Sequence, residues 1–245
     1  MENYERVIFA PDIHAPYQDE KWLASFLKFI KYFKPDTIFI MGDLIDFYAI
    51  SRFLKDPDRA LRLQEEIDCA VNILKQIRYA YLKANIYYIR GNHEYRLQKY
   101  LWSNAKELAG LRCIKIETLL ELERFRIKYI EQGRLDYHGL VVKHGSLVRK
   151  YAAYTAKGEF EKTGKSGVSA HTHRGAIYYQ SNAGGNYAWM ECGCGCQLDA
   201  EYLEGETPNW LQGWGVGHLK KTSNRFNLES VPFVDGKAMY QGKEF

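Results

Sequence analysis

The chain has 245 residues, of which 46% are hydrophobic and 26% are charged. These fractions are ordinary for a soluble globular protein, and they argue against a disordered, collagen-like or coiled-coil chain. The formal net charge of +4 is a mild basic excess, which suits an anionic ligand such as a phosphate but is far from the charge of a protein that coats DNA.

Five short apolar runs are predicted to be buried strands, and each of them ends in polar residues. The runs cover residues 7–10, 37–41, 86–89, 140–142 and 167–170. β-Branched and aromatic runs bounded by Gly or Pro are typical of such strands. In open α/β sheets the ligand lies beyond the carboxyl ends of the strands, so we expect a site built from the polar residues that follow these runs.

Two helices are predicted between the first three strands. The first presents an apolar face from Trp22 to Phe33 with Asp19 as its N-cap, and the second covers roughly residues 57–83. The resulting strand–helix–strand–helix–strand order implies right-handed crossovers between parallel strands. The segment 94–126 is helical and charged in character, and we expect it to be a cap or lid over the site.

After His173 the pattern indicates short strands and turns. Asp235-Gly236 lies between two apolar runs, 231–234 and 238–240, and predicts a hairpin. Pro232 cannot donate to a strand ladder, so the first of these strands is expected to be short or to lie at a sheet edge. We find no repeat, low-complexity tract or linker in the sequence, and we expect residues 1–245 to form a single domain.

The number and the spacing of the cysteines both bear on the class of protein. Five cysteines, an odd number, do not form the framework of a secreted disulfide-rich protein. Cys192, Cys194 and Cys196 alternate with glycine, so on a strand their thiols would all face one way. A buried strand of small residues is the main interpretation, and a redox or additional metal role is the alternative. Structural zinc sites favour Cys-x-x-Cys spacing and a second pair, which this run lacks.

The location of the protein is predicted from its first residues and from its apolar runs. No basic segment followed by an apolar stretch precedes Val7, as a signal peptide would require. No uninterrupted apolar stretch approaches the roughly 20 residues that span a bilayer. We therefore expect a cytoplasmic protein that does not associate with a membrane.

Histidines and carboxylates gather at the predicted strand ends. Five of the seven histidines stand there, beside three aspartates and an asparagine: His14, His93, His144, His171 and His173, with Asp12, Asp43, Asp46 and Asn92. A lone histidine is more often a structural residue, but this interleaving exceeds what a random scatter gives. Imidazole and carboxylate ligands together suit Mn, Fe, Zn or Ni rather than Ca.

These motifs resemble those of the calcineurin-like metallophosphoesterase superfamily. Five blocks occur in the family's order between about residues 8 and 174: Asp12-Ile13-His14, Gly42-Asp43-Leu44-Ile45-Asp46, Gly91-Asn92-His93-Glu94, His144-Gly145 and Ala170-His171-Thr172-His173. The resemblance implies a four-layer α/β fold, in which two packed mixed β-sheets are flanked by α-helices. It also implies a two-metal site at the carboxyl ends of the strands.

The resemblance assigns the metal ligands residue by residue. One divalent cation would be held by Asp12, His14 and His173, and the other by Asn92, His144 and His171, with Asp43 as the bridge between them. Mn is the expected metal, with Fe, Zn or Ni as alternatives. Two divalent ions about 3.5–4 Å apart can activate a bridging water and neutralise charge on phosphorus.

The resemblance also assigns the acid–base residues. His93 would be the general acid, or a stabiliser of the transition state, near the leaving oxygen. Asp46 would accept a hydrogen bond from His93, which fixes its tautomer and raises its pKa. Glu94 is expected to support the loop rather than to bind metal. Arginines near the motifs are candidates for contact with a phosphate oxygen, namely Arg52, Arg90, Arg96, Arg149 and Arg174.

One departure from the family pattern bears on the substrate. Phe47-Tyr48 follows Asp46, whereas the Ser/Thr protein phosphatases of the superfamily continue there with Arg-Gly. The missing arginine, which clamps phosphate, weighs against a protein phosphatase. His14 and the pair His171/His173 are instead similar to the nuclease and phosphodiesterase branches.

We therefore expect a hydrolase whose metal-bridging water cleaves a phosphate ester, with phosphodiester bonds of nucleic acid or a nucleotide as the favoured substrate. A phosphomonoesterase acting on nucleotides or phosphoproteins is the alternative. A non-catalytic scaffold on the same fold is a remote third interpretation, because none of the expected ligand and acid positions is substituted.

Overall fold

A computed structural model describes residues 3–52, 62–199 and 207–245 of the chain. The helices in these residues are α1 (Glu20–Phe33), α2 (Leu63–Ala80), α3 (Glu94–Asn104), α4 (Ile116–Leu119) and α5 (Tyr154–Thr163), with 3-10 turns at Tyr48–Ile50, Lys106–Leu108 and Arg112–Ile114. The strands are β1 (Tyr4–Ala10), β2 (Thr37–Ile40), β3 (Asn85–Ile89), β4 (Ile127–Ile130), β5 (Arg134–Tyr137), β6 (Leu140–Lys143), β7 (Gly167–Ser169), β8 (Gly175–Asn182), β9 (Gly185–Cys192), β10 (Gly213–Lys220), β11 (Phe226–Val234), β12 (Lys237–Tyr240) and β13 (Lys243–Glu244).

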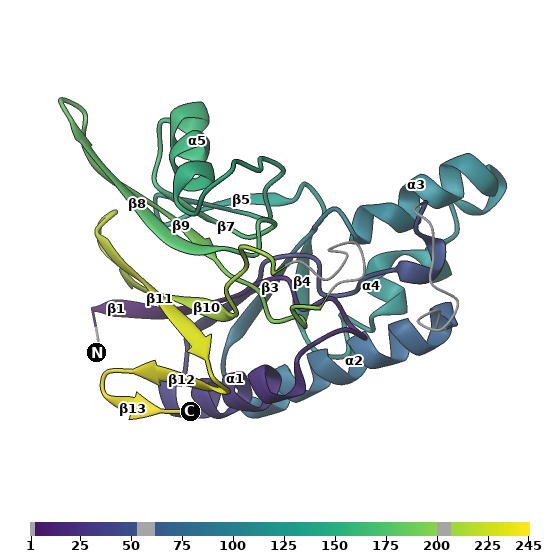
Figure 1. Cartoon of the computed structure of the whole chain (residues 1–245). Coiled ribbons are helices and arrows are strands. Elements are labelled where there is room, and N and C mark those ends of the chain that lie inside the picture. The colour runs from purple at the N-terminus through teal and green to yellow at the C-terminus, as the bar shows by residue number, and fades with distance from the viewer. Residues whose placement is uncertain (1–2, 53–61, 200–206) are drawn as a thin grey trace.

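The described strands form two mixed sheets (Figure 1). One sheet has the order β13-β12-β11-β10-β1-β2-β3-β4, and the other has the order β5-β6-β7-β9-β8. Strands β1 to β4 are parallel, whereas β10 to β13 are antiparallel to their neighbours. In the second sheet β7 is parallel to β6 and β9, while β5 and β8 are antiparallel. The five predicted strands correspond to β1, β2, β3, β6 and β7.

Both faces of the central strands are buried, which explains their continuous apolar runs. Val7 and Phe9 of β1 belong to the core between the two sheets, whereas Ile8 belongs to the core under α1 and α2. On the outer face of the second sheet, α5 packs Ala156 against Trp189 of β9. The layers are therefore helices, sheet, sheet and helix, as Figure 1 shows, and the predicted four-layer α/β fold is confirmed.

The first predicted helix is α1, and it begins at its predicted cap. The carboxylate of Asp19 accepts hydrogen bonds from the backbone N–H groups of Lys21 and Trp22, at 2.8 and 2.9 Å. The second predicted helix is α2, which ends at Ala80, a few residues earlier than expected, and its predicted start near residue 57 lies outside the described residues. Within the described ranges, no helix is long and apolar enough to cross a bilayer.

Asp19→Ala is expected to reduce the free energy of unfolding by about 1–2 kcal/mol, because two N–H groups at the start of α1 lose their acceptor. The other carboxylate oxygen of Asp19 also accepts from Gln212 at 3.0 Å, which places the effect toward the upper end. Urea denaturation measures the change. Asp68→Ala, an exposed position inside α2, serves as the control, and an equal loss in both variants would contradict the cap assignment.

The strands after His173 differ from the prediction of short strands. β8, β9 and β10 have eight residues each and β11 has nine. β11 pairs with β10 on one side and β12 on the other, so the prediction of a short or edge strand around Pro232 is wrong. β12 pairs only with Phe233 and Val234 of β11. Among the described residues, β11 is therefore paired on one side only at the position of the proline. The hairpin at Asp235-Gly236 is confirmed.

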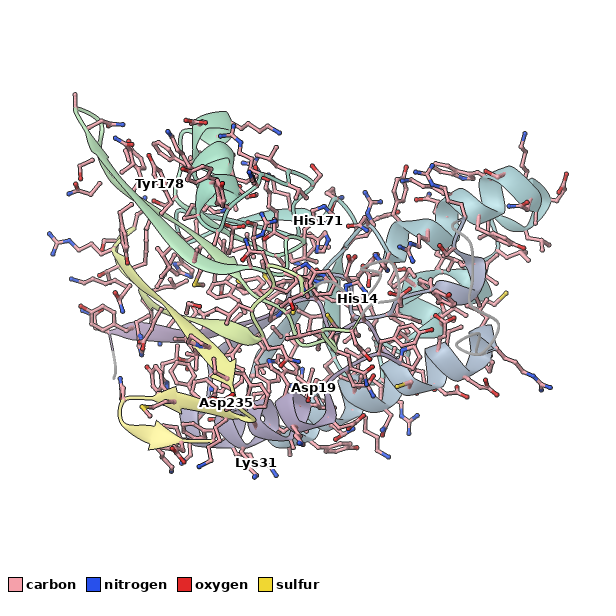
Figure 2. The ribbon with its side chains drawn as sticks, viewed as in Figure 1. His14, Asp19, Lys31, His171, Tyr178 and Asp235 are labelled. Atoms are coloured by element: carbon pink, nitrogen blue, oxygen red, sulfur yellow. The ribbon has the colours of Figure 1, made fainter. Side chains whose placement is uncertain are left out.

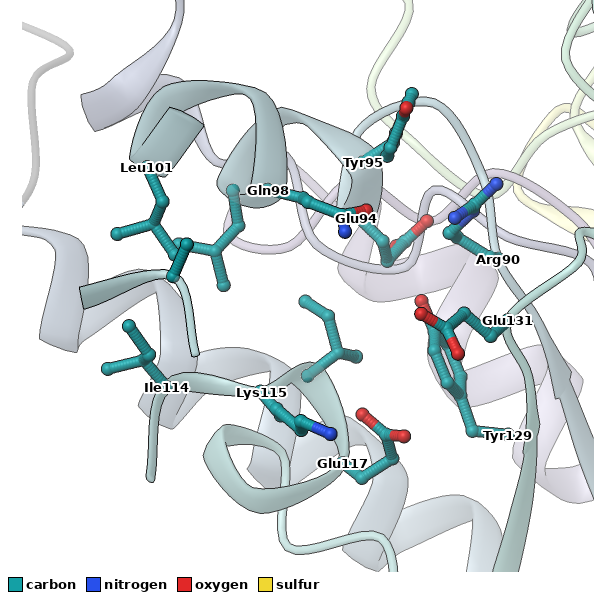
Figure 3. Close-up of a pocket in the computed structure, with 13 residues that line it drawn as sticks. Arg90, Glu94, Tyr95, Gln98, Leu101, Ile114, Lys115, Glu117, Tyr129 and Glu131 are labelled. Carbon is teal, nitrogen blue, oxygen red and sulfur yellow. The ribbon is translucent and has the colours of Figure 1, made fainter. Parts of the chain in front are cut away.

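Residues 94–126 fold as α3, two 3-10 turns and α4. Figure 3 shows that α3 and the segment 109–117 line a pocket, with Tyr129 and Glu131 at one side. The pocket has a volume of about 110 Å³, and its lining includes none of the predicted metal ligands. It is therefore distinct from the predicted site, and the lid role of this segment stays a prediction.

Candidate metal centre

The predicted site residues meet where the two sheets face each other. Loops after β1, β2 and β3 carry Asp12, His14, Asp43, Asn92 and His93, whereas loops after β6 and β7 carry His144, His171 and His173. Figure 2 shows His14 and His171 on the two sides of this junction. Both sheets thus contribute, because each delivers the carboxyl ends of its parallel strands to the same edge.

The first predicted ligand set converges around the inner ring nitrogen of His173. Its Nε2 lies 3.1 Å from Nε2 of His14 and 3.5 Å from Oδ1 of Asp12. One ligand atom from each of these three residues lies within 4.8 Å of the others. Asp43 closes the set, since its Oδ2 is 4.0 Å from Nε2 of His14.

The second predicted set converges around His144. Its Nε2 lies 3.2 Å from Oδ2 of Asp43, 3.0 Å from Oδ1 of Asn92 and 3.2 Å from Nδ1 of His171. The same Asp43 oxygen therefore faces both sets. This is the arrangement that a bridging carboxylate requires, because a cation placed in either set would contact it.

The outer ring nitrogens of two histidines are already hydrogen-bonded. Nδ1 of His14 lies 2.9 Å from Oδ2 of Asp46, and Nδ1 of His144 lies 2.9 Å from the backbone oxygen of Met41. When Nδ1 donates in this way, the lone pair of Nε2 stays available for a cation, as is usual for metal-binding histidines. The donor set and these outer contacts both fit borderline divalent cations.

Comparison with known proteins agrees with this geometry. The family model for calcineurin-like phosphoesterases matches residues 5–204. The chain belongs to the calcineurin-like phosphoesterase family. It is 29% identical to the Gene 54 protein of Mycobacterium phage D29 (97% of each chain covered) and 27% identical to that of phage L5 (98% of each). Membership supports metal-dependent hydrolysis of phosphate esters and implies divalent cations.

A solved structure that is similar to this chain has the same fold. Vacuolar Protein Sorting 29 from Cryptosporidium parvum superimposes with a TM-score of 0.54, covering 100% of this chain and 99% of its own. The two sequences are only 12% identical, so this likeness concerns the fold alone. It agrees with two mixed sheets and flanking helices.

In this member of the calcineurin-like phosphoesterase family, Asp46 and His93 do not pair as simply as predicted. Nδ1 of His93 lies 2.8 Å from the backbone oxygen of Asp46 and 3.3 Å from its carboxylate. The same carboxylate oxygen lies closer, at 2.9 Å, to Nδ1 of His14. Asp46 therefore contacts both histidines and links the predicted acid to a predicted metal ligand.

Arg96 was predicted only as one of five arginines near the motifs, and the structure places it against His93. Its Nη2 lies 2.9 Å from Nε2 of His93, and its Nη1 donates to the backbone oxygen and to Oδ1 of Asp46 at 3.0 and 3.1 Å. Arg96 follows His93 by three residues at the start of α3, so helical spacing could have indicated this contact.

Glu94 supports the loops and belongs to none of the ligand groups around Asp43. Its buried carboxylate accepts hydrogen bonds from the backbone N–H groups of Asp43, Leu44 and Gly91 at 3.0, 3.0 and 2.7 Å, and from the hydroxyl of Tyr88 at 2.7 Å. It thereby ties the loop after β2 to the loop after β3. This geometry agrees with the supporting role expected from the sequence.

The charges of the cluster are strongly coupled. Burial alone would raise the pKa of Asp43, but His144 and His93 hold it well below its ordinary value. Burial alone would lower the pKa of His144, but Asp43 raises it to about 10. The pKa of His93 is also raised, by Asp43 and Asp46 against the effect of burial. A cation that binds here replaces protons on such histidines, because only unprotonated imidazole is a ligand.

Several of these residues have a backbone conformation that is unfavourable for side chains. His14, Asp43, His171 and His173 have φ values of 53°, 49°, 70° and 57°. Each such residue costs on the order of 1–3 kcal/mol and persists only where its surroundings enforce it. Gly91 allows the chain to pass close to the side chain of Asp43, since a Cβ on residue 91 would lie 2.1 Å from Oδ1 of Asp43. Such strain concentrates at functional sites.

Proposed function

We propose that the chain is a phosphoesterase that hydrolyses phosphodiester bonds of nucleic acid or a nucleotide, with Mn²⁺ as the favoured cation. The convergence of two ligand sets on one oxygen of Asp43 carries the proposal. Asp12, His14 and His173 would hold one cation, and Asn92, His144 and His171 the other. Bound cations of this kind supply an activated water and neutralise charge on phosphorus.

His93 is the residue proposed to protonate the leaving oxygen. Its Nε2 lies 3.7 Å from Oδ2 of Asp43, at the edge of the cation sets. Burial alone would lower the pKa of His93, but in the metal-free protein Asp43 and Asp46 raise it above its ordinary value. The backbone oxygen of Asp46 holds its Nδ1, which directs Nε2 toward the place where the ester would sit.

Arg96 is proposed to bind a non-bridging oxygen of the phosphate. Its Nη2 is directed at the same ring nitrogen that must face the leaving group. A phosphate entering the site would replace this contact, which frees Nε2 of His93 to carry a proton. Asp46 anchors the other end of the guanidinium, so the side chain is held in place for the new contact.

The preference for a diester rests on charge. Phe47, at the position where protein phosphatases have an arginine, is completely buried in this chain. A phosphate monoester carries a second negative charge that a further guanidinium would stabilise, whereas a diester carries one. The mild basic excess and Arg96 therefore match a singly charged phosphodiester better than a phosphoprotein.

Two other functions serve as competing proposals. A phosphomonoesterase acting on nucleotides or phosphoproteins would use the same cation sets, because a two-metal site handles both ester types. A non-catalytic scaffold has no need for ligand sets that meet at Asp43 or for strained backbone at four predicted ligands. These observations favour an enzyme over a scaffold.

A paired assay with Mn²⁺ tests the proposed function. It compares hydrolysis of bis-p-nitrophenyl phosphate, a diester, with that of p-nitrophenyl phosphate, a monoester. We expect preference for the diester, and loss of activity in Asp43→Ala. Preference for the monoester would replace the proposal by a phosphatase. Failure to hydrolyse these esters, DNA, RNA or cyclic nucleotides, with cations shown to be bound, would favour the scaffold.

His93→Ala is expected to lower kcat roughly 10²–10⁴-fold on an ester with a poor leaving group, the range typical of a lost general acid. The loss should be much smaller on a nitrophenyl ester, whose leaving group needs little protonation. The measurement is the ratio of the two losses. An equal loss on both esters would contradict the acid role and favour a role in charge stabilisation.

Arg96→Gln is expected to lower kcat/KM by roughly 10–100-fold, because a hydrogen bond to a charged group contributes about 1.5–3 kcal/mol. Arg96→Lys should restore part of the loss, since the charge returns without the planar fork. Arg124→Gln, at an exposed position far along the chain from the motifs, should leave kcat/KM unchanged. Full activity of Arg96→Gln would remove this residue from the phosphate site.

A further inference from the structure

Two buried thiols face the outer ring nitrogen of His173. Sγ of Cys196 lies 3.8 Å from Nδ1 of His173. Nε2 of His173 faces Asp12 on the inner side of the ring. Ligand atoms of His173, Cys194 and Cys196 all lie within 4.8 Å of one another. The proposed hydrolysis uses Nε2 of His173 only. Nδ1 of His173 and the thiols of Cys194 and Cys196, here called the thiol cluster, therefore have no part in it.

The thiol cluster does not arise from a continuous strand, as the alternating sequence predicted. β9 ends at Cys192, and Gly193, with a φ of 83°, turns the chain so that the next two cysteines leave the strand direction. Cys192 belongs to the core between the sheets, whereas Cys194 and Cys196 lie next to His173. All three are buried with free thiols, as the interpretation of a small-residue segment required.

The backbone fixes both thiols at the back of the metal centre. The N–H of Cys194 donates to the oxygen of Leu211 at 3.0 Å, and the N–H of Gly195 donates to the oxygen of Asp12 at 2.9 Å. Gly195 also packs on Trp22, where a Cβ would lie 2.6 Å from the indole ring. The two cysteines are therefore held beside His173 by the same backbone that positions a predicted metal ligand.

The donor atoms of the thiol cluster point to a thiophilic cation. In His14 and in His144, a single oxygen atom of a neighbouring residue orients the outer ring nitrogen. One acceptor would therefore be enough to orient the ring of His173. Two sulfurs and one imidazole nitrogen are instead a ligand set found in zinc sites, with a fourth position left for another donor. Sulfur ligands select Zn²⁺ or Cu⁺ and disfavour the hard cations Mg²⁺ and Ca²⁺.

We propose that Cys194, Cys196 and Nδ1 of His173 form a further cation site, which takes Zn²⁺ and shares the His173 ring with the dinuclear centre. Binding of the cation forms two bonds to sulfur and one to nitrogen. Each thiol releases one proton to solvent, and the ring releases its last N–H proton when both of its nitrogens are ligated. The proposal depends on the proposed function only through this shared ring, because the two thiols lie outside the hydrolytic ligand sets.

Cobalt titration of the metal-free full-length protein tests the proposal. Co²⁺ bound to thiolate gives a near-ultraviolet charge-transfer band that oxygen and nitrogen ligands do not give. We expect this band in the unaltered protein and its loss in Cys194→Ser and Cys196→Ser. Cys113→Ser, which changes an exposed thiol in the 3-10 turn Arg112–Ile114, is the matched control and should keep the band. An unchanged band in the Cys194 and Cys196 variants would overturn the proposal.

X-ray absorption of the zinc-loaded unaltered protein gives a second result that does not depend on variants folding. We expect a sulfur shell at about 2.3 Å from zinc, the usual Zn–S distance. Oxygen and nitrogen neighbours alone would overturn the proposal and leave the thiols as groups that only orient His173. Asp43→Ala separates this inference from the proposed function, because it should lose ester hydrolysis and keep the cobalt–thiolate band.

Discussion

Asp43→Asn is expected to abolish most ester hydrolysis and to leave the protein with at least one cation fewer. Oδ2 of Asp43 lies 3.2 Å from Nε2 of His144 and 4.0 Å from Nε2 of His14, so one oxygen serves both ligand sets. Asparagine has nearly the same shape but no charge. Loss of a cation removes several kcal/mol of charge stabilisation from the transition state, which corresponds to a fall of roughly 10²–10⁴-fold in kcat/KM.

The measurement combines kcat/KM with metal analysis of the purified variant. Asp136→Asn is the control, because this exposed carboxylate on β5 pairs with Arg134 and Lys165 at the surface. It should retain both activity and cations. If Asp43→Asn kept its full complement of cations and normal turnover, Asp43 would not be the bridge, and the two ligand sets would have to act independently.

Glu94→Ala is expected to reduce the free energy of unfolding of the metal-free protein by about 4 kcal/mol or more. The buried carboxylate accepts from three backbone N–H groups and one hydroxyl, and each buried donor left without an acceptor costs about 1–3 kcal/mol. Glu94→Gln should lose less, since its oxygen still accepts while its amide nitrogen faces N–H donors. Denaturation in urea measures both changes.

Glu94→Ala should also bind cations more weakly, because the carboxylate of Glu94 holds the backbone of Asp43 in the position that the bridge requires. Glu107→Ala, at an exposed position in the turn after α3, is the control and should change stability by no more than about 0.5 kcal/mol. A stability of Glu94→Ala equal to that of this control would show that the hydrogen bonds of the carboxylate are replaced by other acceptors.

The parts of the fold that could be predicted are those with a strong local signal. The apolar runs of β1 and β2 are continuous because both of their faces are buried, and α1 has a cap and one apolar face. β10 was missed, although it lies beside β1 in the centre of the larger sheet. Its alternate residues are glycines, which are rare in strands. A Cβ at Gly213 would lie 2.5 Å from the backbone oxygen of Val231, so the close approach of β11 requires glycine there.

Part of the candidate site could also be predicted from the sequence, and part could not. The strand-end residues could be predicted because short motifs carry them, and the structure brings them together around Asp43. The contacts of Asp46 with His14 and of Cys196 with His173 could not be predicted. Both depend on segments far apart in the chain, and their partners are fixed only when the two sheets are assembled.

The strand-end residues are expected to hold two cations that share Asp43. Anomalous diffraction from a crystal of the protein grown with Mn²⁺ tests it most directly. We expect two peaks about 3.5–4 Å apart, one among Asp12, His14 and His173 and the other among Asn92, His144 and His171, with Asp43 between them. A single peak in this cluster, or peaks only elsewhere, would contradict the two-cation centre.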